Sequence, residues 1–132
     1  MRSDSWFSIK FHDGRLLFLD QTKLPSSEEY IHTDNPERVA EAIKRLEIRG
    51  APLIGIAAAY ALALSVKRGF SEQVFHSAFQ LLASTRPTAV NLFNCLQRMK
   101  KFCFDLPVQE RNFHNLLLEA ERIHSEDEMM CE

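Results

Sequence analysis

The chain has 132 residues, of which 45% are hydrophobic and 26% charged, and its formal net charge is -2. This length suits one folded domain, and the composition excludes a disordered or fibrous chain. Its basic residues are scattered among acidic ones, so no basic stripe exists for nucleic acid and we expect no nucleic acid partner.

Neither a signal peptide nor a membrane span is expected. Residues 1 to 9 lack the apolar run of a secretory signal. The longest apolar stretch, Ala51 to Val66, is shorter than the roughly 20 residues that a membrane helix needs. The three cysteines show no metal-ligand spacing and indicate reduced thiols in a cytoplasmic protein; they are Cys95, Cys103 and Cys131.

The N-terminal part of the chain predicts a β-hairpin. Apolar and polar residues alternate from Trp6 to Phe11, a second short strand pattern runs from Arg15 to Asp20, and Asp13-Gly14 between them favours a tight turn. The following segment, Gln21 to Asn35, is expected to be a connection with at most a short strand near Tyr30.

Two helices are predicted on either side of Arg49-Gly50-Ala51. Asp34 is a suitable cap for the first, which should run from Pro36 to about Leu46. The second should begin at Pro52, whose missing N–H costs nothing in a first turn, and should reach about Arg68, with Gly69 as its stop.

Three more helices follow. Ser71 can cap one that ends near Ser84, a second should run from Thr88 to the Leu106-Pro107 step, and the last should begin near Phe113 and fray in the acidic segment 125–132. The predicted fold class is therefore mainly α, a bundle of about five helices preceded by a small N-terminal β-hairpin.

Two arginines precede predicted helix starts, Arg49 before the second helix and Arg86 before the fourth. Free N–H groups and the positive end of a helix favour an anion, and arginine adds a bidentate donor. Gly50 and Ala51 would allow a ligand to approach the backbone closely. The pattern indicates a site for a sugar phosphate; the alternative is that each arginine is only solvated or paired with a nearby acid.

Other chemistry has little support in the residues. The five histidines lack the spacing of paired metal ligands, so we expect no metal. His124 and Glu128 could form an ion pair on a helix surface. No nucleophile with its base, no activated cysteine and no glycine-rich phosphate loop is visible. The residues alone thus predict a helical domain with an anion site.

Three blocks of the sequence carry a family resemblance. The segments Leu19 to Pro25 (LDQTKLP), Ala42 to Tyr60 (AIKRLEIRGAPLIGIAAAY) and Arg86 to Phe93 (RPTAVNLF) resemble the N-terminal region of methylthioribose-1-phosphate isomerases. That family belongs to a wider group, which includes regulatory subunits of the exchange factor for translation initiation factor 2 and the ribose-1,5-bisphosphate isomerases.

The resemblance implies an aldose-ketose isomerisation, an intramolecular oxidoreduction that converts 5-methylthioribose 1-phosphate to 5-methylthioribulose 1-phosphate in methionine salvage. It implies no external cofactor, and a homo-oligomer as the assembly. The substrate-binding residues that it assigns are Arg49, Gly50, Ala51 and Arg86. Asn94-Cys95 departs from the family's usual pair of an aromatic and a small residue.

The resemblance also implies what the chain lacks. In the family, the catalytic cysteine and aspartate lie in a C-terminal Rossmann-like domain, and none of the three cysteines here matches. We therefore expect residues 1–132 to be a single domain, the α part of a larger α/β protein, with no catalytic residue and no activity alone. A separate polypeptide could supply the catalytic domain. The alternative function is a regulatory or protein-interaction module like the initiation-factor subunits.

Overall fold

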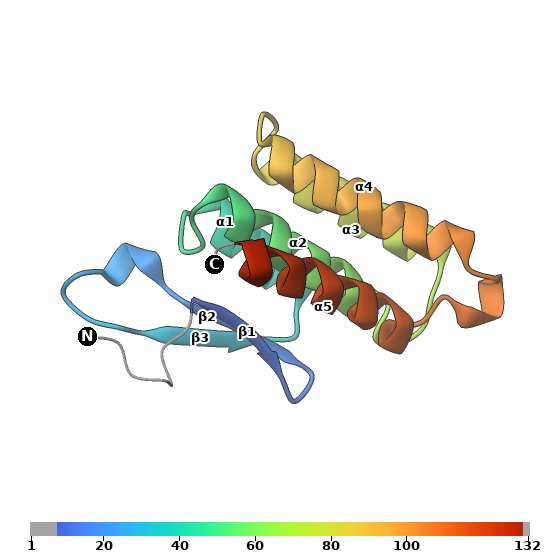
Figure 1. Cartoon of the computed structure of the whole chain (residues 1–132), viewed down its shortest axis with the longest axis horizontal. Coiled ribbons are helices and arrows are strands. Elements are labelled where there is room, and N and C mark those ends of the chain that lie inside the picture. The colour runs from blue at the N-terminus through green and yellow to red at the C-terminus, as the bar shows by residue number, and fades with distance from the viewer. Residues whose placement is uncertain (1–7, 131–132) are drawn as a thin grey trace.

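The computed structural model describes the backbone of residues 8–130 and the side chains of residues 8–127. Within this part, a small sheet precedes five α-helices, which confirms the predicted fold class (Figure 1). The elements in chain order are β1 (Ile9–His12), β2 (Arg15–Leu19), η1 (Gln21–Lys23), β3 (Tyr30–Thr33), α1 (Pro36–Lys44), α2 (Ala51–Ser65), α3 (Glu72–Thr85), α4 (Val90–Asp105), η2 (Val108–Glu110) and α5 (Phe113–Met130).

The sheet is antiparallel, with strand order β1-β2-β3. Asp13 and Gly14 both have positive φ angles, 57° and 76°, which is the backbone of the type I′ turn expected for a two-residue hairpin. Phe18 pairs with Ile9 on one side and with Ile31 of β3 on the other. The short strand near Tyr30 thus widens the predicted hairpin, whereas Trp6 lies outside the described residues.

Helix α2 lies at the centre of the helical part and contacts the other four helices. Every residue from Ile54 to Leu64 is buried, so this helix has no polar face. Its alanines at positions 57–59, 61 and 63 are fully buried. Small side chains let neighbouring helices pack closely, and the apolar stretch is therefore the core of the bundle.

The sheet joins the helices through an aromatic cluster. Phe11 of β1 stacks on Tyr60 of α2 with ring centroids 5.1 Å apart. The buried Tyr60 hydroxyl lies 2.8 Å from Nδ1 of His124 on α5. His124 therefore has a packing role at this junction, and the side chain of Glu128, its predicted ion-pair partner, lies outside the described residues.

Two helix ends in the first half of the bundle differ from the prediction. Helix α1 is capped by Asn35, not Asp34: the Asn35 side chain accepts the Glu37 N–H at 2.8 Å. Helix α2 ends at Ser65, before the predicted Arg68, because the next residues form tighter turns in which Lys67 N–H bonds to the Leu64 carbonyl.

Two ends in the second half differ as well. Helix α4 begins at Val90 instead of Thr88, since the Ala89 N–H donates to the Arg86 carbonyl and closes a turn ahead of the helix. Helix α5 does not fray near residue 125 but continues through the acidic segment, where Glu126 receives two hydrogen bonds from Arg98. No helix in the described part of the chain is long and apolar enough to cross a membrane.

Candidate anion-binding site at one end of the bundle

The first half of the predicted site is the loop between α1 and α2. The buried Ile48 anchors it, and Gly50 follows with a φ of 95°, a left-handed backbone that glycine adopts without strain. A side chain at Gly50 would meet nothing within 4 Å, so the backbone angle and not space requires glycine. Gly50 is the N-cap of α2 and supplies no side-chain hydrogen bond, with Ala51 and Pro52 opening the helix.

Arg49 is exposed next to this helix start. Its Nη2 donates to the Gln21 carbonyl at 3.1 Å. A guanidinium has five N–H donors, and this contact uses one of them. No other hydrogen bond of this side chain is found among the described residues.

The second half of the site is the turn between α3 and α4. Arg86 is the C-cap of α3 and is half-buried. Ala89 is the N-cap of α4, again without a side-chain hydrogen bond. Helix N–H groups that no side chain caps can bind water or an anion. Both helices that begin beside the two arginines have such uncapped N–H groups.

The first turns of α2 and α4 lie together. A Cβ built on Gly55 of α2 would be 2.6 Å from Sγ of Cys95 and 3.2 Å from the carbonyl oxygen of Asn91 on α4. Figure 1 shows both helices beginning at the same end of the bundle and running in the same direction. The structure thus brings Arg49, Gly50, Ala51 and Arg86 to one end, although no hydrogen bond or ion pair among the described residues links the two arginines.

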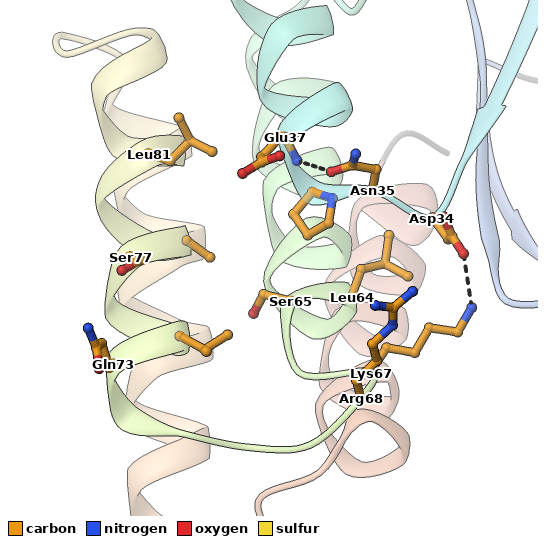
Figure 2. Close-up of a pocket in the computed structure, with 13 residues that line it drawn as sticks. Asp34, Asn35, Glu37, Leu64, Ser65, Lys67, Arg68, Gln73, Ser77 and Leu81 are labelled. Carbon is orange, nitrogen blue, oxygen red and sulfur yellow. Dashed lines mark hydrogen bonds and ion pairs between the residues drawn. The ribbon is translucent and has the colours of Figure 1, made fainter.

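A groove lies elsewhere on the described part of the chain. It has a volume of about 590 Å³ and is enclosed by the start of α1, the end of α2 and one face of α3 (Figure 2). Lys67 at its edge pairs with Asp34 at 3.5 Å. Ser65 is the last residue of α2 and Arg68 follows the helix, so this groove and the candidate anion site lie at opposite ends of α2.

The family model described as the initiation factor 2 subunit family matches residues 47–132, which cover most of α1's exit loop and all four following helices. The chain belongs to the initiation factor 2 subunit family.

Individual members of the family confirm the resemblance found in the sequence. The methylthioribose-1-phosphate isomerase of Marinobacter nauticus is 39% identical over 129 residues, covering 96% of this chain and 37% of that protein. The isomerase of Heliobacterium modesticaldum is 41% identical over 134 residues, covering 95% of this chain and 39% of that protein. The chain therefore spans less than two fifths of the length of these relatives.

Two solved structures of the family share the fold. The 5-methylthioribose 1-phosphate isomerase of Pyrococcus horikoshii has a TM-score of 0.82 and 34% identity, over 90% of this chain and 36% of that one. The subunit delta of translation initiation factor eIF-2B from A. fulgidus has a TM-score of 0.80 and 39% identity, over 93% of this chain and 38% of that one. Both branches of the initiation factor 2 subunit family thus contain this fold.

The two described thiols of this family member do not suit nucleophilic chemistry. Burial raises the pKa of Cys95, and burial also raises the pKa of Cys103 to about 11. Both thiols are protonated at neutral pH, whereas a catalytic cysteine works as a thiolate. Among the described residues, no three histidine, cysteine or acidic side chains gather as metal ligands would.

Sequence reasoning missed one part of the site. The main-chain carbonyl of Gln21 accepts a hydrogen bond from the side chain of Arg49, which lies 28 positions later in the sequence. The segment Leu19 to Pro25 carried the family resemblance, but a main-chain contact leaves no signature in the type of side chain. The resemblance of this segment to the family was therefore the available signal, and it assigned no physical role to Gln21.

Proposed function

We propose that residues 1–132 form the N-terminal substrate-binding domain of a methylthioribose-1-phosphate isomerase. In this proposal, Arg49, Gly50, Ala51 and Arg86 hold the phosphate of 5-methylthioribose 1-phosphate. The observation that carries it is the arrangement of two parallel helices that begin without side-chain caps at one end, each next to an arginine. The isomerase relatives support the identity of the ligand.

The proposed reaction balances within the substrate. The bond between C1 and the ring oxygen breaks, and a hydrogen moves from C2 to C1. The C2 hydroxyl loses its proton to become a carbonyl, while the ring oxygen takes up a proton and becomes the C4 hydroxyl. No external oxidant or cofactor is needed. Arginines on the phosphate fix the sugar relative to the groups that move protons and oppose the charge of the phosphate.

The acid and base of this reaction are proposed to lie outside the chain. A Rossmann-like catalytic domain supplies them, joined to this domain or carried by a separate polypeptide, and the complete enzyme is a cytoplasmic homo-oligomer of the methionine salvage route. The lengths of the relatives leave room for such a domain, because the chain spans 37% of the Marinobacter nauticus isomerase. Alone, the chain binds substrate and does not convert it.

The experiment is a binding titration of the purified chain combined with a turnover assay. Arg49→Lys and Arg86→Lys should each weaken the binding of 5-methylthioribose 1-phosphate by about 1–2 kcal/mol, since lysine cannot bind phosphate in a bidentate manner. Arg45→Lys is the control, because Arg45 pairs with Glu41 on the exposed side of α1. Turnover by the chain itself, or binding that neither site variant weakens, would contradict the proposal.

A second function has its own support. The eIF-2B subunit delta of A. fulgidus is as similar in fold as the isomerase, and the start of α4 exposes two large apolar residues, Val90 (68%) and Phe93 (49%). This favours a regulatory or protein-interaction module without enzyme activity. Tight binding to translation initiation factor 2, together with a sugar phosphate that avoids both arginines, would establish this function instead.

A further inference from the structure

The main chain of Gln21 lies between two residues of the loop that carries Arg49. Its N–H donates to the Glu47 carbonyl at 2.9 Å. Its own carbonyl accepts the Nη2 hydrogen bond of Arg49 at 3.1 Å. Gln21, in the connection between β2 and β3, thus makes two contacts. Its N–H binds the loop just before Arg49, and its carbonyl binds the Arg49 guanidinium.

The turn around Gln21 is itself firmly held. The buried Asp20 accepts two hydrogen bonds on Oδ1, one from the Thr22 N–H at 2.9 Å and one from the Thr22 hydroxyl at 2.6 Å. The Asp20 N–H donates to the Glu29 carbonyl at 2.8 Å. The carbonyl offered to Arg49 therefore has a fixed direction before any ligand arrives.

The loop is held from the other side by an ion pair. Nη1 of Arg38 on α1 lies 2.8 Å from Oε1 of Glu47, whose side chain is only 12% exposed. The two atoms lack the alignment of a hydrogen bond, and neither has another hydrogen-bond partner in the described part of the chain. The largely buried Glu47 carboxylate therefore depends on Arg38 for a compensating charge, and this pair ties the loop to α1 two residues before Arg49.

We infer that these five residues, Asp20, Gln21, Thr22, Arg38 and Glu47, form a positioning element for Arg49, named here the Gln21 brace. The inference rests on the proposed function, in which Arg49 binds phosphate. A long arginine side chain loses rotamer freedom when it binds a ligand. Because the brace already orients the guanidinium through one N–H, less freedom remains to be lost when the other donors bind a ligand.

The test uses the Nε–Hε NMR signal of Arg49, assigned by its disappearance in Arg49→Lys. Glu47→Gln keeps the shape of the side chain and removes its charge, and Thr22→Val removes one of the two hydrogen bonds to Asp20. Both variants should increase the mobility of the Arg49 signal without ligand and weaken the binding of inorganic phosphate and ribose 5-phosphate about three- to tenfold. Glu41→Gln is the matched control, since it removes an exposed carboxylate that pairs with Arg45 on the same helix.

Circular dichroism and the urea midpoint separate positioning from unfolding, and the mild Thr22→Val keeps the test valid if Glu47→Gln does not fold. An Arg49 signal that is equally ordered in the chain and in the folded brace variants would overturn the inference. If the unaltered chain binds neither phosphate ligand, the proposed function fails, and the ligand-free Arg49 signal still decides whether the brace orients this side chain.

Discussion

The cationic side chains of this domain differ in what they contact. Arg98 binds two glutamates, and Arg111 donates to the carbonyls of Leu106 and Phe104 at the end of α4. Arg49, by contrast, contacts one main-chain carbonyl, and Arg86 makes no ion pair with a described residue. The arginines before α2 and α4 thus keep donors that Arg98 and Arg111 use in contacts within the bundle, which supports their proposed role as ligand contacts.

The thiol of Cys103 predicts a pH dependence of stability. Cys103 is fully buried, and burial raises its pKa from 9.0 to about 11. Between these values the unfolded chain releases a proton that the folded chain keeps, so the free energy of unfolding falls as the pH rises, by up to about 1.4 kcal/mol per pH unit. Below pH 9 this contribution is fully present.

Urea denaturation from pH 8 to pH 10.5 measures the effect, with Cys103→Ala as the comparison. The variant loses packing at every pH but has no thiol to titrate, so its stability should decline less steeply than that of the unaltered chain. Other titrating groups are common to both proteins and cancel. Parallel profiles would show that the Cys103 thiol does not contribute.

At the scale of the element, the close contact between α2 and α4 depends on Gly55. Gly55→Ala adds a Cβ that would lie 2.6 Å from Sγ of Cys95 and 3.2 Å from a backbone oxygen of α4. We expect a loss of about 1–3 kcal/mol in unfolding free energy, although alanine is the better helix former. Cys95→Ala in the same chain removes the closer atom and should restore part of the loss, which a double-mutant cycle by urea denaturation would measure.

The contact between α4 and α5 depends on Arg98. Its Nε donates to the buried Glu119 at 2.8 Å, and the same side chain binds Glu126, whose pKa it lowers. Arg98→Gln leaves Glu119 with less compensation in a buried position, so we expect a loss of about 2 kcal/mol.

Hydrogen exchange should show faster opening of α5 beyond residue 123 in Arg98→Gln. Lys101→Gln is the control on the same helix, because Lys101 pairs with Asp105 on the exposed side of α4 and such pairs contribute about 0.3–0.5 kcal/mol. Equal destabilisation by the two substitutions would show that the contacts of Arg98 with α5 stabilise the domain no more than an exposed pair within one helix.

Sequence patterns predicted all five helices because apolar periodicity is a local property. The end of α5 was predicted wrongly since its acidic segment is held by Arg98, a partner 28 positions earlier. The cap of α1 was placed at Asp34 because Asp34 and Asn35 are both good cap residues, and only the backbone decides between them. Contacts between distant elements, including the Gln21 brace, leave no periodic signal.

At the scale of the whole molecule, stability depends on the central helix α2. Ala58 is fully buried in its middle, so Ala58→Leu adds three carbons where neighbouring helices leave no room. We expect a loss of about 1–3 kcal/mol, detected as a lower thermal midpoint. Val90→Leu enlarges an exposed residue of α4 and should leave the midpoint unchanged; a comparable drop there would contradict this explanation.

The sequence predicted a candidate site at one end of the bundle but gave no sign of the groove at the other end. The candidate anion site could be predicted because its residues precede helix starts, which sequence signals mark. The groove was not found because its walls come from α1, α2 and α3 and exist only when these helices are assembled.

Helix α2 begins at the proposed anion site and ends in the wall of the groove. Its 15 residues span about 22 Å at the usual rise of an α-helix, and a helix of this length transmits displacement along its axis without compressing. If the proposed anion shifted Ala51 along this axis, Leu64 and Ser65 would shift with it. A molecule in the groove that resisted the shift would then weaken anion binding, and by thermodynamic reciprocity the anion would weaken the binding of that molecule by the same factor.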